Sequence, residues 1–266
     1  MKQTKRLFGT KEWAGKNFNL YSGCPRNCKY CYAKSMAIRF KRKTVDTWEQ
    51  EEELKTSPLN KSVKKYDGTV MFPSTHDITL EHLPQITYFL KRLLKEGNDV
   101  LIVSKPQLEC IKHLCKKLRK YKTSVTFRFT IGSCNNDTLS FWEPDAPSYE
   151  ERLNCLKLAY NKGYNTSISC EPMLDSNAEK LIEEVGEFVT DTIWLGLMNK
   201  TKQRLKVNGY DESSLTMRRA CELLRRHSDK FILSLYKRLR HNPKIRWKDS
   251  ISEILDREGI RYNRGI

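Results

Sequence analysis

The sequence predicts an α/β fold in which short strands alternate with helices and a parallel sheet curls into a partial barrel. Six apolar, β-prone runs are each followed by a segment of helical periodicity, the alternation typical of βα units. Right-handed crossovers between such units would curl the sheet. The chain has 266 residues and 38% hydrophobic content, enough to bury a large core.

The expected elements follow one another with short connections. Strands are predicted at residues 17–21, 68–73, 98–103, 124–131, 165–170 and 192–198. Helices are predicted at residues 33–43, 80–95, 108–118, 148–162 and 178–189. We therefore expect residues 1–200 to form the barrel core with an N-terminal arm. Residues 201–266 are expected to form a basic, mainly helical extension (215–239 and 247–257) packed on that core as part of one structural unit.

Composition indicates a reduced, cytoplasmic protein. The nine cysteines are an odd number scattered over the chain, which is not a disulfide framework. No stretch of eighteen apolar residues is available to span a membrane, and the first residues lack a secretory signal.

The net charge of +17 is concentrated at the two ends. Residues 1–43 carry 12 Lys and Arg against 1 acidic residue, and residues 200–266 carry 18 against 8. Such ends either bind a polyanion such as nucleic acid or form an ordinary solvated surface.

The most informative stretch is residues 21–32, where Cys24, Cys28 and Cys31 stand at C-x3-C-x2-C spacing. Thiolates bind iron–sulfur clusters or zinc, and a closed zinc site usually has four protein ligands. Three cysteines instead fit a [4Fe–4S] cluster whose fourth iron is open. A zinc knuckle and three unrelated loop cysteines are the alternatives.

This spacing, with Tyr30 before the third cysteine and Tyr32-Ala33 after it, resembles the cluster loop of radical S-adenosylmethionine (radical SAM) enzymes. The resemblance implies a (β/α)6 partial TIM-like barrel and a cluster whose open iron chelates S-adenosylmethionine. It also implies reductive cleavage to a 5′-deoxyadenosyl radical, a one-electron donor of flavodoxin or ferredoxin type, and an adenine contact by Tyr30.

Further segments resemble the spore photoproduct lyase-like, or DNA repair photolyase-like, branch of that family. They are residues 75–83, residues 143–148 with Glu151-Arg152, and Ser167-x-x-x-Glu171-Pro-Met-Leu-Asp175. The lyase donates hydrogen from a cysteine, and that position is Ser74 here. Because a hydroxyl O–H bond is too strong for this donation, Cys134 and Cys170, each just past a predicted strand, are candidate donors. The alternative is that both are buried structural thiols, which is the more common role of cysteine.

Ligands of α/β barrels lie at the carboxyl ends of the strands, which selects four candidate cofactor contacts besides Tyr30, and a fifth, Arg128, alternates with Phe127 and Phe129 on the fourth strand, where its side chain could point into the barrel. Ser74, Thr75 and Asp77 follow the second strand and could accept from the cofactor's ammonium group or cap a helix. Arg128 could pair with the cofactor carboxylate or form a structural ion pair. Glu171 could bind ribose hydroxyls or pair within the barrel.

The sequence thus favours a radical SAM enzyme, of lyase or transferase type, acting on nucleic acid or a nucleotide in repair or modification. A peptide or small-metabolite substrate is the alternative within the class. A zinc-containing nucleic-acid-binding protein is the alternative of another class.

Overall fold

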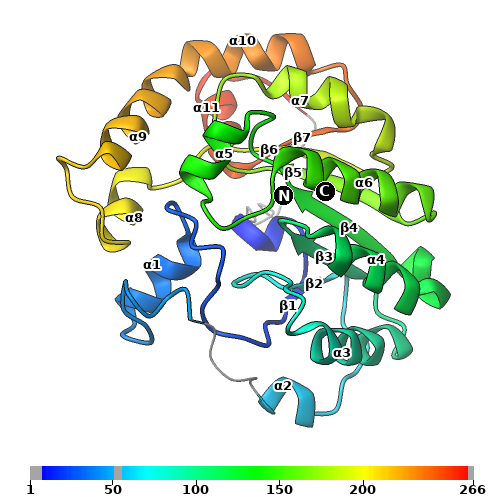
Figure 1. The fold of residues 1–266 in the computed structure, drawn as a ribbon. Coiled ribbons are helices and arrows are strands. Elements are labelled where there is room, and N and C mark those ends of the chain that lie inside the picture. Colours follow the sequence, from blue (N-terminus) through cyan, green and yellow to red (C-terminus); the bar gives the residue numbers. More distant parts are fainter. Residues whose placement is uncertain (1–7, 51–55, 263–266) are drawn as a thin grey trace, which may run out of the picture.

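The computed structural model describes residues 8–50 and 56–262. Seven parallel strands form one sheet in sequence order and curl into a half-barrel with helices on its outer face (Figure 1). The strands are β1 Lys16–Asn17, β2 Val70–Phe72, β3 Val100–Ser104, β4 Val125–Thr130, β5 Asn165–Cys170, β6 Ile193–Leu195 and β7 Ile245–Trp247. The partial TIM-like barrel is confirmed.

The helices of the described residues follow the expected alternation and add a C-terminal group. They are α1 Tyr32–Arg39, α2 Thr56–Asn60, α3 Leu83–Lys95, α4 Leu108–Lys117, α5 Asn136–Trp142, α6 Tyr149–Asn161, α7 Ala178–Val185, α8 Thr201–Val207, α9 Leu215–Arg226, α10 Asp229–Leu239 and α11 Asp249–Arg257. Short 3₁₀ helices are η1 Gly9–Glu12, η2 Arg119–Ser124 and η3 Gly186–Phe188. None of these helices is long and apolar enough to cross a membrane.

Alternating side chains of the strands separate the core from the barrel interior. On β4, Phe127 and Phe129 are fully buried in the main apolar core, where Phe127 meets Tyr164 edge to face at 5.1 Å. Arg128, between them, lies on the opposite face of the sheet, as the period of two requires. The core thus lies between sheet and helices.

The N-terminal arm occupies the interior of the half-barrel, where η1 lies in the middle of the ribbon (Figure 1). Trp13 meets Trp194 of β6 edge to face at 5.9 Å. The cations of Arg128 and Lys248 lie 4.8 and 4.5 Å from the Trp13 ring centroid. The Lys248 ammonium also donates to the Gly9 carbonyl at 2.8 Å. The arm therefore ties β4, β6 and the end of β7 together.

The C-terminal extension differs from its prediction in two ways. The sheet has a seventh strand that was not predicted, because Ile245–Trp247 pairs in parallel with β6, and the helix expected at 247–257 begins two residues later as α11. The expected helix 215–239 is two helices, since the Ser228 hydroxyl accepts from the Phe231 amide and starts α10 anew. The extension is therefore part of the same sheet as the core.

The first strand is shorter than predicted. β1 ends at Asn17, and the following residues bond to the loop after β2 instead. The Asn19 side-chain oxygen accepts from the amides of Ser74 and Thr75 at 2.7 and 2.8 Å. The Leu20 amide donates to the His76 ring at 3.1 Å. These bonds lead the chain out of the sheet and into the cysteine-containing loop.

Candidate active site

The cysteine loop, residues 21–32, is shaped by its backbone. The Cys24 amide donates to the Trp48 carbonyl at 3.0 Å. At Gly23, φ is +93° and a Cβ atom would lie 2.4 Å from the Gln50 carbonyl oxygen, so only glycine fits. Asn27 takes a left-handed conformation with φ of 44°, which asparagine tolerates better than most residues. These features turn the chain tightly enough to bring the three cysteines together.

The three thiols are sheltered and near one another. Burial, followed by the neighbouring charges of Asp77, Cys28 and Cys31, raises the pKa of Cys24. Burial likewise raises the pKa of Cys28 to about 12 and raises that of Cys31. Cys31 caps α1, and its sulfur accepts from the Lys34 amide at 3.4 Å. The positive helix end favours a thiolate there, as metal ligation requires.

Asn208, the residue that ends α8, holds this loop from the C-terminal extension. Its side-chain amide donates to the carbonyls of Lys29 and Cys31 at 2.9 and 3.1 Å. Its oxygen accepts from the Ser35 hydroxyl at 2.8 Å. Asn208 is 1% exposed, so no solvent replaces these bonds. The position of the loop carbonyls therefore depends on α8.

A buried ionic network fixes Tyr30. The Tyr30 hydroxyl donates to Glu143, which pairs with Arg152 at 2.6 Å and with Lys105 at 3.8 Å. Burial alone would raise the pKa of Glu143, but the two cations outweigh it and lower the pKa. Arg152 also donates to the carbonyls of Pro147 and Thr130. The Tyr30 ring is consequently packed at 8% exposure beside Trp142.

Among the charged groups of this network, Lys105, which directly follows β3, is the one whose side chain is partly exposed to solvent. Its side chain is 18% exposed, while those of Glu143 and Arg152 are 0% exposed. Neighbouring Cys28, Glu143 and Asp77 raise the pKa of Lys105 against the opposing effect of burial. The ammonium group is therefore charged beside the cysteine loop and available to an anionic group.

The candidates after β2 are engaged within the protein. Asp77 pairs with Arg26 of the cysteine loop at 3.3 Å and accepts from the Ser104 hydroxyl and the Ile78 amide. The Ser74 hydroxyl accepts from the Asn19 amide at 2.8 Å, and its carbonyl accepts from the Tyr32 hydroxyl. The structure thus brings this segment against the cysteine loop.

Arg128 has internal partners at the other end of the sheet. Its guanidinium donates to the Ser167 hydroxyl at 2.9 Å and lies 3.4 Å from the Asp191 carboxylate, which precedes β6. Burial lowers the pKa of Arg128 to about 10, although Asp191 opposes the shift. These contacts match the structural ion pair named as the alternative to a cofactor contact.

Glu171, directly after β5, competes with another carboxylate for one cation. Lys248 contacts Glu12 closely and is 3.7 Å from Glu171, whose side chain is 21% exposed. Burial raises the pKa of Glu171 to about 7; Lys248 lowers it, whereas Asp249 and Glu12 raise it. Glu171 is therefore poised to hold or release a proton near neutral pH.

The candidate hydrogen donors differ in accessibility. Cys170 is 0% exposed and its sulfur lies 3.8 Å from the Gly132 carbonyl. Cys134 is half-buried, and burial raises its pKa to about 11. Of the two thiols, Cys134 is the one closer to solvent.

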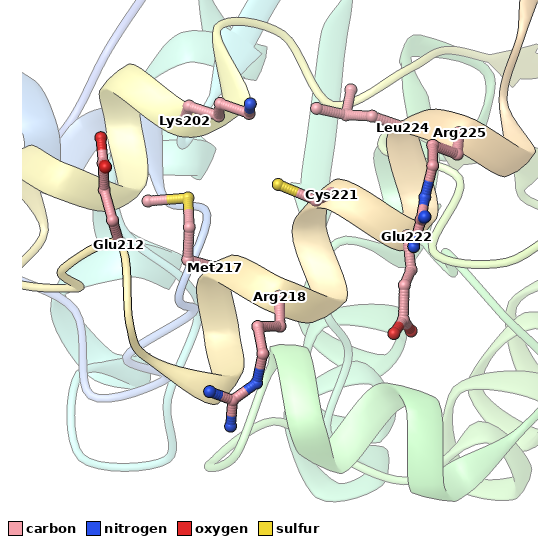
Figure 2. A pocket seen from close by; sticks show the side chains of 8 residues that line it. All are labelled: Lys202, Glu212, Met217, Arg218, Cys221, Glu222, Leu224 and Arg225. Carbon is pink, nitrogen blue, oxygen red and sulfur yellow. The ribbon is translucent and has the colours of Figure 1, made fainter.

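A further thiol, Cys221, borders a cavity of about 610 Å³ between α8 and α9 (Figure 2). The thiol and the Lys202 ammonium point toward one another across the space, whereas Arg218 and Glu222 point away (Figure 2). The lining comprises Lys202, Glu212, Met217, Arg218, Cys221, Glu222, Leu224 and Arg225. None of these residues belongs to the cysteine loop or directly follows β2–β5.

Residues 18–189, which carry the cysteine loop and strands β2 to β5, match the family described as the radical SAM superfamily. The chain belongs to this superfamily. It is therefore an enzyme of a family that uses a [4Fe–4S] cluster and S-adenosylmethionine.

Two uncharacterised proteins are similar in sequence. ORF301 of Acidianus two-tailed virus is 28% identical over 66% of this chain and 60% of its own length. MJ0683 of Methanocaldococcus jannaschii is 26% identical over 64% of this chain and 65% of its own length. The chain thus spans under two thirds of either relative.

Solved structures share the fold. A single-site mutant of spore photoproduct lyase superposes with a TM-score of 0.53 at 17% identity, covering 81% of this chain and 76% of that one. Streptococcus suis SuiB bound to S-adenosylmethionine superposes with a TM-score of 0.50 at 13% identity, covering 85% and 48%. At these identities the likeness concerns the fold.

The donor set fits an iron–sulfur cluster. Three sheltered thiols, one at a helix N-terminus and one beside a lysine, are soft ligands of the kind that hold iron–sulfur clusters. Within residues 8–50 and 56–262, no three His, Cys, Asp or Glu groups are arranged to hold a single metal ion. A cluster binds its cysteines at separate irons and does not require the sulfurs to meet at one point. Cys24, Cys28 and Cys31 would hold it.

The structure adds residues that the sequence analysis did not assign. Lys105 followed a predicted strand and could have been selected as a cation at a strand end. Glu143 and Arg152 were noted only as parts of a resemblance. Asn208 carried no signal, because its partners lie 179 and 177 positions away in the sequence.

Replacing Asn208 should weaken cluster retention without unfolding the barrel. In Asn208→Ala, the carbonyls of Lys29 and Cys31 lose their donors, and loss of such supporting bonds typically lowers metal affinity about 10- to 100-fold. Iron bound per chain during titration with a chelator measures the effect. Asn161→Ala, at an exposed position of α6, is the control. Equal iron retention in both variants would contradict this role.

Glu171 should make stability pH-dependent. Because its folded pKa of about 7 exceeds the ordinary value of 4.5, the folded state holds a proton that the unfolded state has lost. The free energy of unfolding should therefore fall as pH rises from 4.5 to about 7, by up to about 3 kcal/mol. Urea denaturation should show this slope reduced in Glu171→Gln and retained in Glu183→Gln, an exposed residue of α7. An unchanged slope in Glu171→Gln would refute the assignment.

Proposed function

We propose that this radical SAM enzyme abstracts a hydrogen atom from a nucleic acid or nucleotide in a repair or modification reaction. One observation supports this substrate class: the basic N-terminal region and the basic C-terminal region of the chain contact each other. α1, from the first 43 residues, packs against α8, from the C-terminal extension (Figure 1). A polyanion bound there would lie beside the cysteine loop, since Cys31 caps α1 and Asn208 ends α8.

When bound, the reduced cluster supplies one electron that cleaves S-adenosylmethionine to methionine and the 5′-deoxyadenosyl radical. Lys105 contributes a fixed cation next to Cys28 that would pair with the carboxylate of the cofactor. Tyr30, held by Glu143, would present a fixed ring to the adenine. These residues bind and orient, and the radical chemistry belongs to the cofactor.

The cofactor's ammonium group would be bound by the segment that contains Ser74, Thr75 and Asp77. The Asp77 carboxylate would not serve as a free acceptor for it. The carboxylate of Asp77 already has Arg26, Ser104 and Ile78 as partners. Glu171 would reach ribose hydroxyls from the end of β5. Cys134, the more accessible thiol, would return hydrogen to a substrate radical.

An external one-electron donor is needed, and a flavodoxin or ferredoxin fits this requirement.

A peptide substrate is the competing choice, because one structural neighbour, SuiB, is described as bound to a precursor peptide. Its likeness to this chain concerns only the fold, whereas the basic ends favour a polyanion.

Isotope transfer tests the substrate class. RNA and DNA from cells grown in deuterated medium are incubated anaerobically with the reduced enzyme and S-adenosylmethionine. We expect deuterium in the 5′-deoxyadenosine, because the radical takes hydrogen from substrate carbon, and none with protonated nucleic acid. 5′-Deoxyadenosine without deuterium in both arms would exclude nucleic acid as the hydrogen source.

Removing the Lys105 cation should weaken cofactor binding. A charge-assisted hydrogen bond contributes about 1.5–3 kcal/mol, so Lys105→Met should raise the dissociation constant of S-adenosylmethionine at least about tenfold. Calorimetry on cluster-loaded protein measures it, with exposed Lys112→Met as the control. Equal dissociation constants in the two variants would contradict the cofactor role of Lys105.

A further inference from the structure

Helix α1 exposes an apolar stripe of three side chains on successive turns. Tyr32, Met36 and Phe40 stand at i, i+4 and i+8 and are 38%, 39% and 63% exposed. Residues at this spacing lie in one line along a helix. The opposite side of α1 is used for folding, since Ala33 and Ala37 are buried with Trp48. The stripe (Tyr32, Met36 and Phe40) is therefore an outward surface.

The stripe begins at the site. Tyr32 follows the cluster ligand Cys31, and its hydroxyl donates to the Ser74 carbonyl, just past β2. The Arg204 guanidinium of α8 lies 6.0 Å from the Tyr32 ring centroid. From there the eight residues to Phe40 advance about 12 Å along the helix, the length of three to four stacked nucleotides.

Cations accompany the stripe. The Arg42 guanidinium lies 5.7 Å from the Phe40 ring centroid. Arg39 and Lys41, on either side of Phe40, are exposed. Each exposed aromatic ring of the stripe thus has an arginine near it, and the nearest exposed acids along the chain, Asp46 and Glu49, come after the run of cations.

We propose that the stripe, with Arg39, Arg42 and Arg204, binds a single strand of nucleic acid and leads it to the cysteine site. The inference rests on the proposed function and adds the path of the substrate. Bases stack on aromatic rings regardless of sequence, and arginines beside the rings pair with phosphates. An acidic electron-transfer protein would satisfy the charges, but rings spaced along a line that starts at the active site match a polynucleotide better.

Binding of a fluorescein-labelled 20-nucleotide single strand, as DNA and as RNA, tests the path by anisotropy on cluster-loaded protein. The variant Met36→Ala/Phe40→Ala keeps Tyr32 and the cysteine loop intact. Because this variant loses the Phe40 ring, stacking energies imply that it binds the strand about tenfold more weakly than the wild type. Arg42→Ala should reduce the slope of log affinity against log salt by about 0.7. Iron content and circular dichroism report folding.

Tyr88→Ala is the matched control. Tyr88 is 58% exposed on α3 and has Arg92 5.7 Å from its ring centroid, as Phe40 has Arg42, but it lies away from the site. We expect wild-type affinity from this variant.

The outcomes separate the two proposals. Salt-dependent binding by the wild type, weakened in Met36→Ala/Phe40→Ala and not in Tyr88→Ala, supports the path. Unchanged binding in the double variant overturns the path and leaves the proposed function standing. If the double variant then also loses electron uptake from reduced flavodoxin, the stripe is assigned to docking of the reductant. Absence of binding by the wild type at low salt overturns both the path and a nucleic-acid substrate, which leaves only a free nucleotide for the proposed function.

Discussion

The fold of this protein is constrained by a loop whose three cysteine side chains we assign to an iron–sulfur cluster. Because these thiols do not anchor the loop, it is held by its backbone and by its other side chains, such as Arg26 on Asp77 and Tyr30 on Glu143. Here Trp48 and Asn208 satisfy backbone groups of the loop, and the absence of a side chain at Gly23 lets Gln50 approach. Because Asn208 ends α8, the C-terminal extension contributes to the site as well as to the sheet.

The buried charged side chains have partners in two separate parts of the interior. Glu143 neutralises Arg152 where neither group reaches solvent, which leaves the partly exposed Lys105 ammonium for an anionic ligand. In the barrel interior, the arm supplies Trp13 to the cations of Arg128 and Lys248. Two carboxylates, Glu12 and Glu171, share Lys248, and burial raises the pKa of Glu171 to about 7 despite this cation.

The sequence was sufficient for features encoded in local spacing. The βα alternation predicted the curled parallel sheet, and the cysteine spacing predicted the family. Features that depend on distant residues were not predictable: Asn208 contacts Cys31 across 177 positions of the sequence, and β7 is a three-residue strand that pairs with β6 after three intervening helices. Arg128 shows a third limit, because the sequence suggested a structural ion pair as one of its two roles but did not identify the partner, Asp191.

The central claim is that Cys24, Cys28 and Cys31 together hold a [4Fe–4S] cluster. Iron and acid-labile sulfide, measured on anaerobically purified protein beside the variant with all three residues changed to alanine, test it most directly. We expect about four irons per wild-type chain, with brown colour, and almost none in the variant. Equal iron in both proteins, or a colourless wild type that contains zinc, would contradict the account.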